Sequence, residues 1–473
     1  MDVSSSGLSR FDAWRARAGA VLAPLSALLI LALGEGGTKT RLAALFAATA
    51  LLWISEAIPA AATALLAVSL AVVLGIAPPK EAFAAMGNPI LFLFIGSFMI
   101  AEAMNLHGLG ARFAWLMTHR VSGRLGALVA TSSVAFLLSM WMSNAAATAV
   151  VLPIALQLAR AVGEQRYAAA TVLSIAWGAS MGGIATPVGT PPNLLGMRAL
   201  EANGVPIDFL SWMKLGLPIG LLMLVAMWIV LAVMFSVRPG VAAPSQAQGP
   251  GRWTRGEIAA LVSFLAAVLL WITPGLLQAA GSSWGRAMSE RLPEEVVAIL
   301  CALLLFVWPL PDGKRALSWA DASRIDWGTV LLFGGGIMLG DLANKTGLAA
   351  DWGRALMEAT GASSLLAVVA LVTAAALILS ELASNTASAT LMVPLAFALA
   401  QSTGTPPIPA VLGATIGASF GFMMPISTAP NAMAYATGQV SMRQMITTGI
   451  VFDVVGYIAV VAAIVLLWPL VAP

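Results

Sequence analysis

Long apolar stretches, repeated along most of the chain, constrain this sequence more than any other feature. A helix that spans a membrane needs about 20 mainly apolar residues, and eleven such stretches are separated by short polar segments. In lipid, only helices and closed barrels satisfy every backbone hydrogen-bonding group. The pattern predicts an all-α polytopic membrane protein. The predicted spans lie near 18–34, 41–58, 60–77, 88–106, 168–190, 212–237, 256–275, 293–310, 327–344, 408–434 and 447–471.

Composition excludes several other classes of protein. The chain is 60% hydrophobic and 10% charged, whereas soluble domains carry about a quarter charged residues. Its single cysteine, Cys301, excludes a disulfide scaffold and an iron–sulfur cluster. The sequence has no H-E-x-x-H and no G-x-x-x-x-G-K-[ST] motif, so zinc proteolysis and ATP-driven pumping lack support. No enzymatic activity is expected.

Two further apolar stretches, 124–160 and 363–401, are each too long for one crossing and carry a polar cluster at the middle. Polar groups at mid-membrane are costly unless they face protein or a water-filled cavity. Both stretches are therefore predicted to be re-entrant helical hairpins with polar tips; two tight spanning helices in each remain the alternative. The polar clusters are Ser139, Ser143, Asn144 and Thr148 in the first, and Ser380, Glu381, Ser384, Asn385, Thr386 and Ser388 in the second.

The chain also repeats itself on either side of a polar linker, 238–255. Secondary transporters commonly contain such internal duplications, with substrate and ion sites built from broken helices at the repeat interface. Four blocks recur in the same order: 94–109 as 333–348, 143–153 as 384–394, 178–182 as 417–421, and 190–193 as 428–431.

Charge placement predicts an orientation. With the N-terminus in the cytoplasm and both hairpins re-entering without crossing, most Lys and Arg residues fall on the cytoplasmic side, as the positive-inside rule requires. Eleven crossings then place the C-terminus outside, and the two repeats are inverted relative to each other. The expected location is a bacterial inner membrane.

The hairpin tips and two proline-containing breaks carry the chemistry. A helix break leaves backbone carbonyl and N–H groups without partners. Oxygens of carbonyl, amide and hydroxyl groups suit a hard cation such as sodium, and N–H groups at the start of a half-helix suit an anion. The breaks lie at 189–193 and 427–431, where proline interrupts the helix.

The paired Ser-Asn tips, each followed by a Thr-Pro-Pro-Asn-type break, resemble the divalent anion:sodium symporter family. The resemblance implies uptake of succinate, malate, fumarate, citrate or sulfate with Na+. It also implies a homodimer in which a scaffold domain holds the interface and a transport domain moves as an elevator. The corresponding segments are a tail (1–17), scaffold helices (18–123), first transport segment (124–237), linker (238–255), scaffold helices (256–362) and second transport segment (363–473).

The same resemblance implies the site residues. The first sodium site comprises Ser139, Ser143, Asn144 and Gly189, and the second comprises Ser380, Ala383, Asn385 and Ser427. The substrate contacts are Asn144, Thr190, Asn385, Thr386 and Thr428.

This sequence departs from the family pattern at two positions. Ala145 stands where the family usually has threonine, and Ala429 stands where a proline is usual. The missing hydroxyl at Ala145 removes one expected carboxylate contact. The acids Glu102, Asp341 and Glu381 have both a structural and a functional interpretation.

The leading function is sodium-coupled import of a small divalent anion, with a C4-dicarboxylate as the expected substrate. The alternatives are a dicarboxylate exchanger or a sodium-independent carrier on the same fold, or sulfate or citrate as the substrate. The expected partners are the dianion, sodium ions, membrane lipids and a second copy of the chain, with no nucleic acid. A channel or membrane enzyme is a more distant third class.

Overall fold

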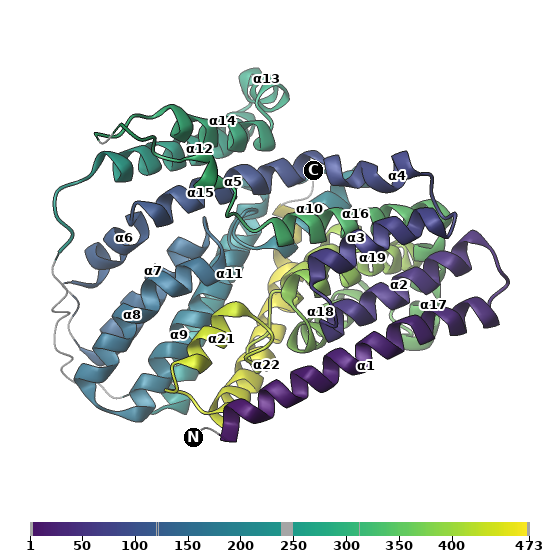
Figure 1. Cartoon of the computed structure of the whole chain (residues 1–473), viewed down its shortest axis with the longest axis horizontal. Helices are drawn as coiled ribbons and strands as arrows, with labels where there is room; N and C mark the ends of the chain where they lie inside the picture. Colours follow the sequence, from purple (N-terminus) through teal and green to yellow (C-terminus); the bar gives the residue numbers. More distant parts are fainter. Residues whose placement is uncertain (1–2, 120, 122, 238–248, 312, 471–473) are drawn as a thin grey trace. The chain divides into compact units, whose positions relative to one another are not determined.

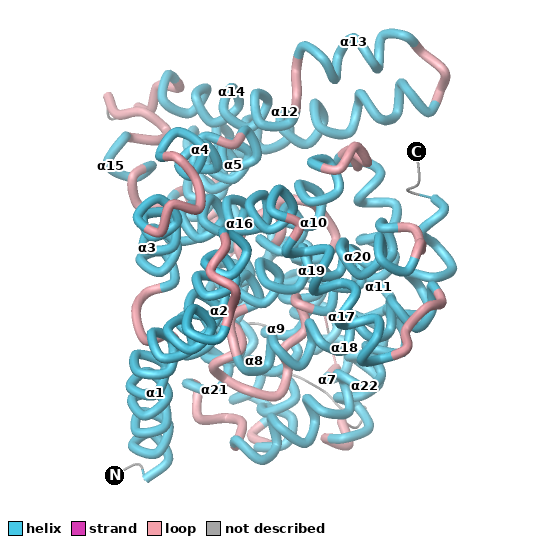
Figure 2. The backbone as a smooth tube through the Cα atoms, turned by 90° about the vertical axis from the view of Figure 1, so that its right-hand side faces the viewer, coloured by secondary structure: helices cyan, strands magenta, loops and turns pink. Residues whose placement is uncertain are grey.

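The computed structural model describes residues 3–119, 121, 123–237, 249–311 and 313–470. Throughout these residues the regular secondary structure is helical, apart from an isolated β-bridge between Pro309 and Arg315. Figure 1 labels the helices and Figure 2 follows the same backbone as a tube. The all-α class predicted from the sequence is confirmed.

The chain divides into two compact units. Unit 1 contains residues 1–91, 195–204 and 326–418. Its central helix is α16, which packs on α3 and α19, while α18 packs on α20. Its helices are α1 (Val3–Leu33), α2 (Thr38–Ser55), α3 (Ala60–Val73), α4 (Pro79–Ala84), η1 (Ala85–Gly87), α16 (Trp327–Thr346), α17 (Leu348–Thr360), α18 (Leu365–Leu382), α19 (Asn385–Thr403) and α20 (Pro407–Gly417).

Unit 2 contains residues 92–194, 205–325 and 419–473. Its central helix is α9, which packs against α7, α8, α11 and α21. Helices α5 and α10 cross the boundary between the units. The helices are α5 (Pro89–Leu106), α6 (Leu109–Thr118), α7 (Arg124–Ser139), α8 (Asn144–Val162), α9 (Gln165–Ile184), α10 (Pro191–Ala202), α11 (Phe209–Met234), α12 (Arg255–Ala279), α13 (Ser283–Arg291), α14 (Glu294–Val307), α15 (Trp319–Ala322), α21 (Ala429–Ala436), α22 (Met442–Leu467) and η2 (Trp468–Leu470).

Each predicted span contains a helix, but the boundaries differ in informative ways. Eight helical segments among the described residues are long and apolar enough to cross a membrane, so the number of crossings stays a prediction. Helix α1 starts at Val3, within the predicted polar tail. The predicted span over 408–434 was expected to break at 427–431, whereas the non-helical segment is 418–428 and so begins nine residues earlier. Apolar side chains kept the hydropathy high there, although the backbone leaves the helix.

The predicted linker is described only in part. Residues 238–248 lie outside the described residues, and 249–254 form no helix. Helix α12 then starts in a capping box, in which the Thr254 side chain accepts from the Glu257 backbone N–H and the Glu257 side chain accepts from the Thr254 N–H. This arrangement satisfies donors that a helix start otherwise leaves without partners.

Small residues allow α9 to lie in the centre of unit 2. All of α9's hydrophobic segment is buried. A Cβ atom added to Gly182 would lie 2.1 Å from the Phe136 carbonyl oxygen, and one added to Gly178 would lie 2.9 Å from the Ser132 carbonyl oxygen. The G-x-S-x-G pattern at 178–182 is thus a close helix contact of the kind that small residues permit in membranes.

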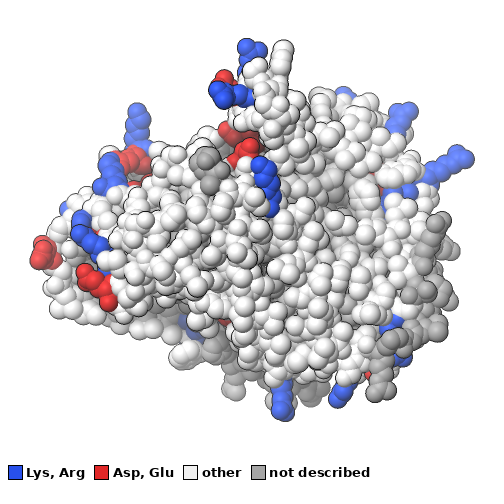
Figure 3. Space-filling view, turned by 180° about the vertical axis from the view of Figure 1, so that it is seen from behind, with Lys and Arg blue, Asp and Glu red and all other residues white. Residues whose placement is uncertain are grey.

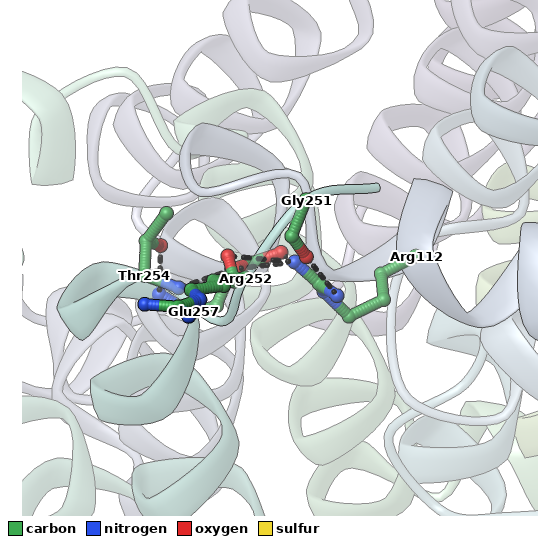
Figure 4. Close-up of polar contacts among 5 residues, drawn as sticks. All are labelled: Arg112, Gly251, Arg252, Thr254 and Glu257. Atoms are coloured by element: carbon green, nitrogen blue, oxygen red, sulfur yellow. Dashed lines mark hydrogen bonds and ion pairs between the residues drawn. The ribbon is translucent and has the colours of Figure 1, made fainter. Parts of the chain in front are cut away.

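A buried ion pair fastens α6 to the start of α12 (Figure 4). The Arg112 guanidinium lies 2.6 and 2.9 Å from the two carboxylate oxygens of Glu257, and both side chains are less than 10% exposed. Arg112 also donates to the carbonyl oxygens of Gly251 and Arg252 and lies over the ring of Trp253. These contacts satisfy a charge that would otherwise be costly to bury.

Much of the outer surface is apolar. On the face drawn in Figure 3, acidic and basic side chains lie mainly near the edges, and most of the middle is covered by uncharged residues. Large apolar side chains such as Val233 on α11 and Leu269 on α12 are 72% and 64% exposed. Soluble monomers rarely expose extensive apolar surface, so this exposure fits a protein whose outer face contacts lipid.

Candidate functional site

The first polar tip joins α7 to α8 within unit 2. Helix α7 ends at Ser139, and α8 begins at Asn144 after the N-cap residue Ser143, whose hydroxyl accepts from the Ala146 N–H at 3.2 Å. The Ser139 hydroxyl donates to Asn144 Oδ1 at 2.7 Å. A serine N-cap followed by this side-chain contact gives the tip a defined geometry.

The break between α9 and α10 lies directly against this tip. A Cβ atom on Gly183 would lie 2.4 Å from Asn144 Oδ1. A Cβ atom on Gly189 would lie 2.6 Å from the Gly183 carbonyl oxygen and 2.9 Å from that of Ser139. The structure therefore brings Ser139, Asn144 and Gly189 together, and Ser143 is the neighbour of Asn144 in sequence. All of them lie within unit 2.

The second tip, in unit 1, repeats these contacts. Helix α19 begins at Asn385 after the N-cap residue Ser384, whose hydroxyl accepts from the Ala387 N–H at 3.3 Å. The Ser380 hydroxyl lies 2.8 Å from Asn385 Oδ1 and 2.8 Å from the Ala418 carbonyl oxygen. Ala383, the C-cap residue directly after α18, has an extended backbone conformation. Ser380, Ala383 and Asn385 thus form one short polar segment.

The second break separates α20 from α21. Ser427 is 1% exposed, and Thr428 is the N-cap residue of α21, with its hydroxyl accepting from the Asn431 N–H at 3.2 Å. These residues belong to unit 2, whereas the second tip belongs to unit 1, and each part is described by itself. The association of Ser427 with Ser380, Ala383 and Asn385 therefore stays a prediction.

The predicted substrate contacts are polar side chains with restricted exposure. Thr190 is 3% exposed and Asn385 is 9% exposed, while Asn144, Thr386 and Thr428 are half-buried. Hydroxyl and amide groups in such positions can hydrogen-bond a carboxylate. At the two departures from the family pattern, Ala145 is half-buried and Ala429 is exposed.

The candidate ligands are neutral oxygen atoms. Among the described residues, no group of three or more His, Cys, Asp or Glu side chains could hold a metal ion. Hydroxyl, amide and carbonyl oxygens nevertheless suit hard cations. A site of this kind would take Na+ in preference to a transition metal.

One residue beside the first candidate site, Gly183, was not among the predicted residues, and the roles of three acids were left open. Gly183 lies between Asn144 and Gly189, and the Gly182-Gly183 pair was the available signal. Of the acids, Glu381 is 3% exposed and Glu102 is half-buried. Asp341 lines a cavity of unit 1 together with Arg198 and Asn344, among other residues.

Comparison of the whole sequence with known proteins gives a consistent result. A family profile described as the sodium:sulfate symporter transmembrane region matches residues 16–472. The chain is 31% identical over 444 residues to the sodium-dependent dicarboxylate transporter SdcS of Staphylococcus saprophyticus. This alignment covers 88% of this chain and 84% of that protein. It is 30% identical over 446 residues to the protein of the same name from Staphylococcus aureus strain USA300, with coverages of 89% and 84%.

A solved structure supports the fold. The crystal structure of the YdaH transporter from Alcanivorax borkumensis, described as having an unusual topology, aligns with a TM-score of 0.60 at 15% sequence identity. The alignment covers 83% of this chain and 88% of that chain. At this level of identity the likeness concerns the fold alone.

Proposed function

Because this chain belongs to the sodium:sulfate symporter family, a family of transporters and not of enzymes, we propose that it imports a small divalent anion together with Na+. The resemblance stated from the two tip motifs is confirmed at the level of the family. The proposed substrate is a C4-dicarboxylate such as succinate, malate or fumarate. The name of the SdcS relatives, sodium-dependent dicarboxylate transporter, supports both sodium coupling and this substrate class.

One observation carries the proposal: both tips present the same serine–asparagine contact at the start of a half-helix. The oxygen atoms are 2.7 Å apart in the first tip and 2.8 Å apart in the second. Each tip therefore places side-chain oxygens beside the backbone N–H groups of a new helix. Oxygens attract a cation, and the helix start attracts an anion, so one arrangement can serve both ligands.

Charge balance explains why sodium is required. The tip segments 139–145 and 380–386 and the break segments 183–193 and 427–431 contain no Lys or Arg. Arg15 donates to the Leu382 carbonyl oxygen of the second tip at 3.2 Å, but its charge is already paired with Glu56. A dianion at mid-membrane is costly unless its charge is compensated, and helix N-termini supply only partial positive charge. Bound sodium ions supply the rest in this proposal, which makes cation and anion binding mutually dependent.

The proposed sodium ligands are the two sets named above. The first comprises Ser139, Ser143, Asn144 and Gly189, supported by the contacts around Gly183 within unit 2. The second comprises Ser380, Ala383, Asn385 and Ser427, supported by the Ser380–Asn385 contact and by the family resemblance. The anion is proposed to contact Asn144, Thr190, Asn385, Thr386 and Thr428.

The proposed working form is a homodimer with inverted repeats and an elevator movement of a transport domain against a scaffold domain.

The orientation in the membrane is proposed from the charge distribution, with a cytoplasmic N-terminus and an external C-terminus in a bacterial inner membrane. In a Cys301→Ala background, Arg252→Cys should then react with a membrane-impermeant thiol reagent only from the cytoplasm. Arg286→Cys should react only from outside, and labelling of both from one face would contradict the orientation.

Uptake by proteoliposomes tests the function directly. Purified protein should accumulate labelled succinate when external sodium exceeds internal sodium, and uptake should saturate. Parallel assays with citrate and sulfate identify the preferred anion. Uptake that is equal with and without a sodium gradient favours the exchanger or uncoupled carrier. Flux that does not saturate favours a channel.

A further inference from the structure

Two buried asparagines lie just after the two breaks, and their side chains turn back across them. Asn193 Nδ2 lies 2.8 Å from the carbonyl oxygen of Gly183 and 2.7 Å from that of Thr186. Asn431 Nδ2 lies 2.6 Å from the carbonyl oxygen of Gly421 and 3.1 Å from that of Met424. In both cases the acceptors precede the asparagine by ten and seven residues, and the asparagine is 0% exposed.

The chemistry of the amide fixes its orientation. An amide nitrogen has two N–H donors, and each asparagine uses both of them on carbonyl oxygens. Reversing the amide would place Oδ1 against the same two oxygens, which is repulsive. In the observed orientation, Oδ1 of Asn193 and Oδ1 of Asn431 accept no hydrogen bond from any described residue, although both are buried. An unpaired buried acceptor is unfavourable, so holding the carbonyl groups is the dominant role of each side chain.

In unit 2 the held carbonyl of Gly183 lies beside the first candidate sodium site. The Gly183 oxygen accepts from Asn193, and it is also the atom that a Cβ on Gly189 would approach to 2.6 Å. Gly183 itself packs against Asn144 Oδ1. A carbonyl oxygen has two lone pairs, so a bond from Asn193 leaves one available to a cation. Asn431 likewise braces the segment 421–424, three residues before Ser427.

We propose that Asn193 and Asn431 are positioning residues that set the geometry of the carbonyl turns and thereby the sodium affinity and cation selectivity of the transporter. This inference rests on the proposed sodium-coupled function. Neither side chain is assigned as a ligand of sodium or of the anion. Residues that orient the direct ligands of a metal typically change its affinity 10–100-fold when they are replaced, so the effect is measurable.

Asn193→Asp and Asn431→Asp provide the sharpest test. Aspartate has nearly the same shape, but its carboxylate repels the two carbonyl oxygens, and even the protonated acid has only one O–H donor for the two of them. In proteoliposome uptake, we expect the half-saturating sodium concentration to rise about tenfold or more. The ratio of sodium-driven to lithium-driven uptake should also change, because moving carbonyl oxygens alters the fit to the ion. The half-saturating succinate concentration at saturating sodium should change much less.

Asn203→Asp is the matched control. Asn203 lies in the turn just after α10, and its Nδ2 donates to the Ala199 carbonyl oxygen at 2.7 Å, at the opposite end of that helix from the break. Its replacement should leave the sodium half-saturation and the lithium ratio within about twofold of the unsubstituted protein, because Asn203 is only half-buried and holds no carbonyl group of either break. A shift as large as that of Asn193→Asp would show that the effect is not specific to the turns.

If an aspartate variant fails to fold, Asn193→Ala and Asn431→Ala test the positioning role instead. They remove both donors without adding charge and should also raise the sodium half-saturation. A lower maximal rate and lower unfolding temperature with unchanged sodium half-saturation and lithium ratio would overturn the inference, since that is the result of a purely structural role. If the unsubstituted protein itself needs no sodium, the proposed function fails instead, so the two failures are distinguishable.

Discussion

The two tips share a backbone arrangement and differ in the side chains they offer. In each, a serine caps the second helix and another serine, five residues before the asparagine, contacts its Oδ1. The third residue of the motif is Ala145 in the first tip and Thr386 in the second. The contacts that shape the turn recur, whereas the groups available to a ligand do not. This difference indicates that the same contacts hold both tips in shape, but that the two tips contribute unequally to ligand binding.

The two breaks also share the contacts that shape the turn and differ in other side chains. Both asparagines after the breaks hold carbonyl groups at equivalent positions. The starts of the following helices differ, because α10 begins with Pro191 and Pro192, which have no N–H to satisfy, whereas Thr428 caps α21 with its side chain. Two prolines open α10, whereas α21 combines one proline, Pro430, with the threonine cap, so the two breaks reduce the number of unpaired donors in different ways.

The largest effect is expected at Gly189. An alanine there would place Cβ within 3 Å of the carbonyl oxygens of Gly183 and Ser139, neither of which is a flexible side chain. Gly189→Ala should lower the free energy of unfolding by about 1–3 kcal/mol and raise the sodium half-saturation about tenfold or more. Gly37→Ala is the control, since a Cβ there meets nothing within 4 Å. A Gly189→Ala variant with normal sodium dependence would remove this turn from the first site.

The next largest effect compares the two asparagines of the tips. Asn144→Ala and Asn385→Ala should each weaken sodium and dicarboxylate binding together, by roughly 10–100-fold, because hydrogen bonds to charged groups contribute about 1.5–3 kcal/mol. Calorimetric titration of each ligand in the presence of the other measures both effects. Loss of affinity for only one ligand would contradict the shared position of the asparagines.

Ala145→Thr tests whether the missing hydroxyl makes the first tip contribute less to anion binding than the second. One added hydrogen bond to a carboxylate should strengthen binding of at least one dicarboxylate by up to about tenfold. Competition of unlabelled succinate, malate and fumarate against labelled substrate measures it. A folded variant that has lost transport would instead mean that Ala145 makes room for a bulkier anion or for closer packing of the tip.

A smaller effect is expected at the two serines that contact the tip asparagines. Ser139→Ala and Ser380→Ala should raise the sodium half-saturation roughly two- to tenfold and leave the dicarboxylate half-saturation at saturating sodium nearly unchanged. Ser380 should show the larger change, because its hydroxyl lies near both Asn385 Oδ1 and the Ala418 carbonyl oxygen. Ser69→Ala, which removes an exposed hydroxyl bonded to Leu65 of its own helix, is the control. An equal effect of Ser69→Ala would contradict a sodium role for either serine.

The smallest effect concerns a surface pair outside both tips. Hydrogen bonds from Lys39 and Arg354 lower the pKa of Asp351. A carboxyl group with a lowered pKa in the folded state stabilises the fold above the pKa of the unfolded chain, near 3.9, and loses this contribution as the pH falls through the folded pKa. Asp351→Asn should therefore reduce stability at neutral pH by less than about 1 kcal/mol, because the pair is exposed. The difference between the two proteins should shrink below pH 4 in thermal unfolding experiments.

The tips were predictable from sequence because their signals are local. Ser143-Asn144 and Ser384-Asn385 interrupt apolar stretches, and the observed helix starts lie at Asn144 and Asn385. The second break was predicted at 427–431, but its start at residue 418 was not, since Phe420 and Phe422 keep that segment apolar. Hydropathy measures side chains, whereas a break is a property of the backbone.

Contacts between distant segments were not predictable. Arg112 and Glu257 form the buried ion pair shown in Figure 4, yet they are 145 residues apart. Counting charges along the sequence cannot identify such a partner. The role of Asn193 was equally hidden, because asparagine near a helix start commonly caps that helix, whereas this side chain holds the preceding turn.

The central claim is that sodium and the dianion depend on each other for binding. Linkage requires that if sodium raises dicarboxylate affinity by some factor, the dicarboxylate raises sodium affinity by the same factor. The most direct measurement is isothermal titration of the purified protein with succinate, or with the anion that uptake identifies, in sodium and again in choline at equal ionic strength. We predict dicarboxylate binding in sodium and binding at least about tenfold weaker in choline, a coupling of at least 1.4 kcal/mol, within the usual range for linked sites. Undiminished binding in choline would contradict the symport mechanism and favour an uncoupled carrier.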